Sequence, residues 1–130
     1  MAKKILLLPF LLLALNSFGQ FTDCYKFRDG RFRIADTHAG VITIAERHGA
    51  YETQSSEALK AVVRFRISWQ DNCSYTLTLD KVIRNENKLD FPSNLTITVK
   101  ITETNGDSCV QETSSSMTNG VYKTEVVKLN

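Results

Sequence analysis

Apolar and polar residues alternate with a period of two along most of this chain, and no stretch of ten or more residues shows a helical period. Such alternation is typical of strands with one buried face and one exposed face. Turn-forming residues separate most of the alternating segments, and the longest connection, residues 83–93, contains Pro92 and is expected to be a loop or a short helix. The predicted strands are residues 24–35, 40–47, 50–56, 60–70, 73–82, 94–104, 107–116 and 120–129.

Short strands joined mostly by tight turns indicate an all-β domain. The fold class we predict is an eight-stranded up-and-down antiparallel barrel, lipocalin-like in architecture. A β-sandwich is the main alternative, but its Greek-key crossovers usually need longer connections than most of those found here.

The first predicted strand changes its apolar phase, because Tyr25 and Phe27 have odd numbers whereas Phe32 and Ile34 have even ones. A β-bulge at Asp29-Gly30 would restore a single apolar face. Four basic residues would then share the opposite face, which we interpret as a solvated outer surface rather than an anionic docking stripe. They are Lys26, Arg28, Arg31 and Arg33.

Residues 66–79, RISWQDNCSYTLTL, predict a β-hairpin. A two-residue turn at Asp71-Asn72 would place apolar residues opposite polar ones, and a one-residue shift reverses every side chain. We therefore predict a three-residue loop, Gln70-Asp71-Asn72, with Asn72 in the left-handed conformation. This register pairs Trp69 with Cys73, Ile67 with Tyr75 and Phe65 with Leu77, and it makes Trp69 and Cys73 core-facing neighbours rather than a reactive site.

The first residues resemble a secretory signal peptide, with Lys3 and Lys4 before an apolar run that is too short to span a membrane. Small residues Ser17 and Gly19 predict cleavage before Gln20, and the residues before Cys24 do not form a lipobox. The prediction is a signal peptide at residues 1–19 and one secreted or periplasmic domain at 20–130. Without the two signal lysines the 16 basic residues fall to 14, which equals the 14 acidic ones. This neutral balance argues against a nucleic-acid partner.

Three cysteines, Cys24, Cys73 and Cys109, allow three pairings of one disulfide and one free thiol in an exported chain. Up-and-down topology places all three toward one end of the barrel. A two-residue turn at Asn105-Gly106 would turn Cys109 outward, so we favour a Cys24–Cys73 disulfide. No cysteine or histidine spacing fits a zinc site, and no cofactor or metal is predicted.

The same register would point Glu112 and Glu125 inward, where two carboxylates could act as acid and base in a small hydrolase. We prefer a shifted register that leaves both in solvent, because buried glutamate is rare. His38 and His48 have Asp36 and Glu46 two residues away, but solvated loop histidines are the preferred interpretation. No nucleophile, phosphate-loop or dinucleotide motif is present, and no catalytic residue is predicted.

Two motifs resemble a family of small secreted, lipocalin-like proteins of Bacteroidetes-type bacteria. The first has Cys24, Phe27, Gly30 and Phe32, and the second has Trp69, Cys73, Tyr75 and Leu77. The resemblance implies a lipocalin-like barrel and no specific chemistry. Chains of this kind are sometimes labelled DNA topoisomerase IV, but a neutral exported domain of about 110 residues lacks the size and the tyrosine setting for strand passage.

The function predicted from the sequence is therefore non-enzymatic binding of a small, partly apolar ligand in the barrel. The alternative is a protein-interaction module or envelope inhibitor that uses loops and outer strands, and a weaker alternative is the hydrolase. The predicted ligand-binding residues are Phe65, Ile67, Tyr75, Leu77, Ile97 and Val99.

Overall fold

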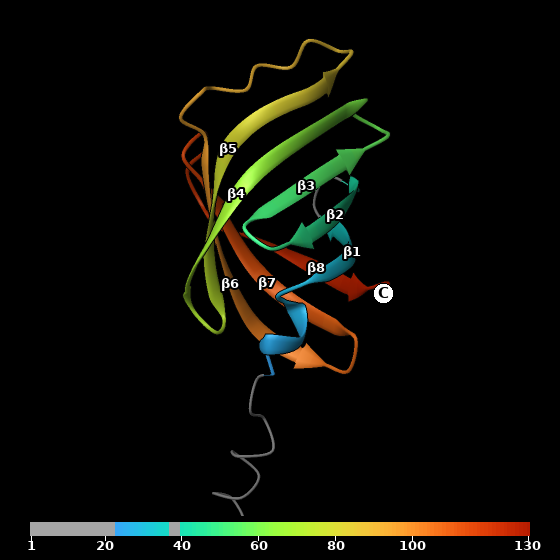
Figure 1. The fold of residues 1–130 in the computed structure, drawn as a ribbon, viewed down its shortest axis with the longest axis vertical. Helices are drawn as coiled ribbons and strands as arrows, with labels where there is room; N and C mark the ends of the chain where they lie inside the picture. Colours follow the sequence, from blue (N-terminus) through green and yellow to red (C-terminus); the bar gives the residue numbers. More distant parts are fainter. Residues whose placement is uncertain (1–22, 37–39) are drawn as a thin grey trace, which may run out of the picture.

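Eight antiparallel strands follow one another in chain order and close into a barrel in the computed structural model, which describes residues 23–36 and 40–130 (Figure 1). Each strand pairs with the next, and β1 also pairs with β8. The predicted fold class is confirmed, while the predicted signal peptide lies outside the described residues. A 3-10 helix, η1 (Tyr25–Phe27), precedes the strands, which are β1 (Gly30–Asp36), β2 (Ile42–His48), β3 (Tyr51–Ser56), β4 (Ala61–Asp71), β5 (Ser74–Asn85), β6 (Thr96–Asn105), β7 (Ser108–Ser115) and β8 (Tyr122–Lys128).

The barrel has two different ends. The short β2–β3, β4–β5 and β6–β7 turns lie at the end closed by η1, which we call the base (Figure 1). The β3–β4 and β7–β8 connections and the long β5–β6 connection lie at the opposite end, the mouth. Residues 83–93 form the end of β5 and then a loop without a helix.

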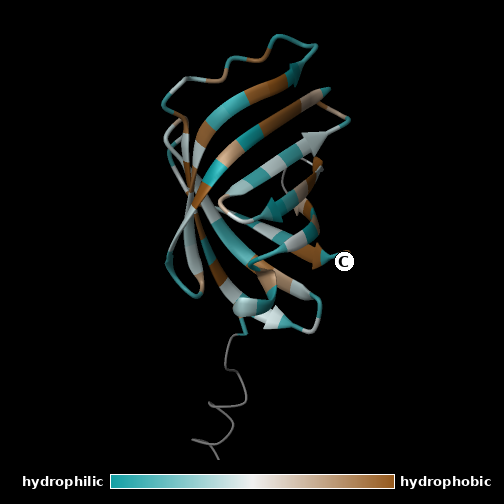
Figure 2. Ribbon diagram, in the orientation of Figure 1, coloured by the Kyte–Doolittle hydropathy of each residue, from teal (hydrophilic) through white to brown (hydrophobic). Residues whose placement is uncertain are grey.

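Two apolar clusters fill the interior. Figure 2 shows hydrophobic and hydrophilic residues alternating along β4 and β5, as a strand with one buried face requires. The base cluster comprises Cys24, Phe27, Phe32, Ala45, Ile101, Cys109 and Val126. The central cluster comprises Val63, Phe65, Ile67, Tyr75, Leu77, Leu95 and Val99.

The first segment corrects one prediction, because the apolar phase changes through η1 and not through a bulge. The 3-10 turn brings Phe27 into the base cluster, where its ring centroid lies 6.0 Å from that of Phe32. Gly30 then starts β1 with a φ of +129°, and a Cβ atom there would lie 2.6 Å from the carbonyl oxygen of Asn130. The segment therefore needs glycine for the close approach of the chain's last residue.

The bulge prediction implied that the four basic residues share one strand face, but they do not. Arg31 and Arg33 are exposed on β1, and Arg31 pairs with Glu46 at 3.5 Å. Lys26 lies in η1, and Arg28, just after η1, places its guanidinium 4.6 Å from the centroid of the Trp69 ring.

The β4–β5 hairpin keeps the predicted faces but has a different register. Ile67 pairs with Leu77, and Trp69 pairs with Tyr75 rather than with Cys73. The turn consists of Asn72-Cys73, an irregularity follows Trp69, and Asn72 does not have a positive φ. The extra residue in the bulge moves the pairing by two positions, and a shift of two leaves every side chain on its face.

The β6–β7 hairpin corrects a second register. Asn105 pairs with Ser108, so the turn is Gly106-Asp107, and a further irregularity lies between Ile101 and Glu103. This bulge reverses the inward phase within β6. As a result Cys109 is buried, which contradicts the predicted outward orientation. It also places Gln111 inward, so the register that would point Glu112 inward is not the one found.

Candidate ligand-binding site

Two adjoining cavities lie inside the barrel. The inner chamber, of about 120 Å³, is nearer the base, and the upper chamber, of about 150 Å³, is nearer the mouth. Thr43, Gln54 and Ile97 line both chambers, so the chambers share a boundary. The remaining residues of the inner chamber are Ile34, Glu52, Tyr75, Leu77, Val99, Gln111, Thr113 and Thr124. Those of the upper chamber are Ser56, Leu59, Ala61, Val63, Phe65, Phe91 and Leu95.

The predicted ligand-binding residues all lie in or against the central cluster. The inner chamber is lined by four of them, Tyr75, Leu77, Ile97 and Val99. Phe65 lines the upper chamber, and Ile67 is buried beside it without lining either chamber. The structure therefore brings these residues together, and a role in ligand binding stays a prediction.

A buried ion pair lies at the inner end of the chambers. Arg47 of β2 donates through Nε to Glu52 Oε1 of β3 at 2.5 Å, and both side chains are almost completely buried. The β2–β3 hairpin places them, because Arg47 and Glu52 are register partners on its inner face. The second carboxylate oxygen of Glu52 accepts from Gln54 Nε2 at 2.6 Å.

The Arg47 guanidinium is satisfied on its other sides too. It donates to the carbonyl oxygen of Phe27 at 2.7 Å and to the Tyr75 hydroxyl. Its central carbon lies 4.5 Å from the centroid of the Phe32 ring and 4.7 Å from that of the Tyr75 ring. Arg47 therefore connects η1, the base cluster and the chamber wall.

Burial shapes the ionisation of this network. Burial raises the pKa of Tyr75 well above its ordinary value, although the Arg47 charge opposes the shift. Burial alone would lower the pKa of Arg47, but Tyr75 and Glu52 outweigh it and the net direction is upward. Tyr75 is thus a neutral hydroxyl at physiological pH, and it also donates to Gln111 Oε1 at 3.3 Å.

Sequence reasoning missed Glu52 and Gln111 in the wall of the inner chamber, and Arg47, which pairs with Glu52. Along β2 the polar Thr43 and Arg47 point inward, whereas Ile42 and Ile44 lie on the outer face. The local pattern favours the opposite assignment. The inward orientation of Arg47 could have been predicted only if the pairing of the strands had been known.

The predicted Cys24–Cys73 disulfide is present and joins the residue before η1 to the β4–β5 turn. Cys109 is the free cysteine and is buried in the base cluster. Burial raises the pKa of its thiol to about 11, with Arg47 acting in the opposite direction. A thiol of this kind is a poor nucleophile at neutral pH.

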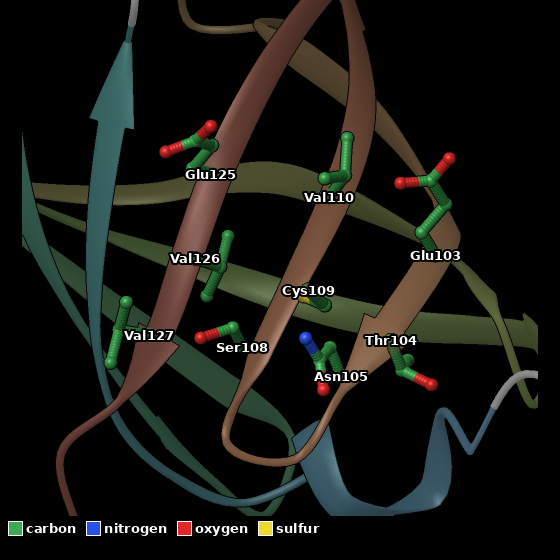
Figure 3. Close-up of a pocket in the computed structure, with 9 residues that line it drawn as sticks. All are labelled: Glu103, Thr104, Asn105, Ser108, Cys109, Val110, Glu125, Val126 and Val127. Atoms are coloured by element: carbon green, nitrogen blue, oxygen red, sulfur yellow. The ribbon is translucent and has the colours of Figure 1, made fainter.

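The two carboxylates considered for hydrolysis lie on the outer face of the sheet and not inside the barrel. Glu112 pairs in register with Lys123 and Lys100, whereas Glu125 is exposed opposite Val110. The shifted register that we preferred is thus confirmed. Figure 3 shows Glu125, Val110 and Glu103 side by side on three strands, along a hollow of about 350 Å³ that excludes Glu112.

Other candidate chemistry is limited in the described part of the chain. His48 is exposed at the end of β2, Glu46 pairs with Arg31 instead, and His38 lies outside the described residues. Within residues 23–36 and 40–130, no group of three His, Cys, Asp or Glu side chains is placed to hold a metal ion. Over the same residues, no helix has the length and hydrophobicity needed to cross a membrane.

Comparison with known proteins adds no relative. No family model, curated protein or solved structure matches the chain. The resemblance to small secreted lipocalin-like proteins therefore stays a prediction.

Proposed function

We propose that this barrel is an exported, non-enzymatic protein that binds a small, partly apolar ligand in its two chambers. The observation that carries the proposal is the pair of adjoining cavities, apolar toward the mouth and polar at the inner end. Ligand sites usually combine an apolar lining with a few polar groups that fix orientation. Each chamber is smaller than the roughly 300–1,000 Å³ that drug-sized ligands occupy, so the ligand is small.

Two observations support export. The Cys24–Cys73 disulfide is of a kind that persists in oxidising compartments. The first 19 residues have the composition of a signal peptide. The resemblance to small secreted barrels agrees with the same compartment.

Native mass spectrometry of the purified exported protein tests the binding proposal. We expect a co-purifying small molecule on the wild-type chain. The Ile97→Phe variant should lose it, because Ile97 lines both chambers and a larger ring would fill the space between them. Thr98→Val, on the exposed face of the same strand, is the matched control and should keep it.

Two results would contradict the proposal. One is a wild-type chain that carries no molecule and takes up no added apolar probe. The other is equal retention by Ile97→Phe, which would place the ligand elsewhere.

A specific observation favours the protein-interaction alternative as the second candidate. Several large apolar side chains are exposed around the mouth, and exposed apolar groups in numbers mark interaction surfaces. Cross-linking on intact cells, with Val121→Ser as the altered chain, would detect a partner seated there. The exposed residues are Ile42, Leu59, Val82, Ile83, Met117, Val121 and Tyr122.

A further inference from the structure

Two hydroxyl groups in the inner chamber have no hydrogen-bond partner among the described residues. They are Oγ1 of Thr113 on β7 and Oγ1 of Thr124 on β8, and both atoms are buried. Thr124 is only 9% exposed and pairs in register with Gln111, two residues from Thr113. Buried hydroxyls normally find a partner, because leaving one unpaired costs free energy. The pair therefore points to an occupant of the chamber that bonds to both.

The charges of the chamber are already neutralised. Glu52 binds Arg47 with one oxygen and Gln54 with the other, and Arg47 uses its remaining nitrogens on Phe27 and Tyr75. No spare cation is thus available for a carboxylate or phosphate, and no spare carboxylate for an ammonium group.

We propose that the inner chamber binds the uncharged hydrogen-bonding head of a small amphiphile, such as an alcohol or an amide, through Thr113 and Thr124. The upper chamber, with Phe65, Leu95 and Phe91 in its wall, then holds the apolar tail, which points toward the mouth. A charged head would lose its hydration without gaining a counter-ion, which is a large cost in a buried site. This inference rests on the proposed function and adds the chemical class of the ligand.

A matched series of probes tests the head-group preference. Binding of 1-hexanol, hexanoate and hexylamine to the full exported chain at neutral pH is measured by calorimetry. We expect 1-hexanol to bind at least about tenfold more tightly than either ion, because burial of an unpaired charge is costly. Equal or tighter binding of hexanoate or hexylamine would overturn the inference.

The Thr113→Val/Thr124→Val variant tests the two hydroxyls. It should bind 1-hexanol roughly five- to tenfold more weakly, because each lost hydrogen bond removes a modest share of the affinity. It should bind cyclohexane unchanged, and its Tm should be equal to or higher than that of the wild type, because valine has a similar shape and no unpaired hydroxyl. The control Thr98→Val should bind all probes as the wild type does.

The outcomes separate the two proposals. Unchanged 1-hexanol binding by the double valine variant would exclude a role for the hydroxyls, while the barrel would still bind a ligand. If no probe bound and no molecule co-purified, the chambers would hold only water, and the proposed function would fail with the inference.

Discussion

Arg47 places a positive charge in the middle of the barrel, and Glu52 is the group that neutralises it. A buried pair of this kind gives little net stability over apolar replacements, but removal of one partner leaves an uncompensated charge. The surrounding bonds to Phe27 and Tyr75 fix the guanidinium in one position. Arg47 therefore fixes the position of Phe27 in the base cluster relative to Tyr75 in the wall of the inner chamber.

Glu52→Gln should lower the free energy of unfolding by about 3–5 kcal/mol, because it leaves the Arg47 charge buried without a counter-charge. Urea denaturation measures the loss. An Arg47→Met/Glu52→Leu variant should unfold closer to the wild type than the single variant does. A loss below about 1 kcal/mol for Glu52→Gln would mean that water reaches the pair.

At this scale the sequence predicts the apolar wall better than the polar one. Phe65, Leu77 and Val99 alternate with polar residues, so their inward orientation follows from period two. Arg47 lies between Glu46 and His48, and Glu52 lies between Tyr51 and Thr53, so the local alternation does not mark either residue as inward. Their orientation depends on cross-strand pairing, which a local pattern does not contain.

Among the elements, the hairpin turns decide which predictions succeed. Gly49 and Gly106 each have a positive φ and occupy the first of the two turn positions, as a type II′ turn requires. The Asn105-Gly106 pair instead suggests a type I′ turn that begins one residue earlier, at Asn105. The irregularity in the β4–β5 hairpin leaves the predicted side chains facing inward, whereas the one in the β6–β7 hairpin reverses which side chains face inward. The number of strands is predictable from the sequence, and the exact pairing is not.

The disulfide ties η1 to the β4–β5 turn across a separation of 49 residues. By the chain-entropy estimate, a loop of about 50 residues contributes about 4 kcal/mol. Cys24→Ser/Cys73→Ser should lose about 2–4 kcal/mol of unfolding free energy in urea without reductant. Reductant should destabilise the wild type to the same level and leave the double variant unchanged. A double variant as stable as the oxidised wild type would contradict this role.

At the scale of the whole molecule, Cys109 offers a probe of how the barrel opens. It lies in the base cluster under η1, and burial raises its pKa to about 11, so the folded chain contains almost no thiolate there. A disulfide reagent should therefore label the folded protein slowly, at a rate that follows global unfolding. In denaturant without reductant, it should modify one thiol per chain. Three modified thiols, or rapid labelling of the folded chain, would contradict the structure.

The pairing of β1 with β8 has a consequence for the order of events during folding. Phe32 meets Lys128 and Asp36 meets Thr124, so the wall closes only through contacts between opposite ends of the domain. A chain that emerges from its N-terminus has to keep the edge of β1 open until the last strand arrives. During that interval β1 is an exposed template for other strands, so conditions that delay the final segment should favour aggregation.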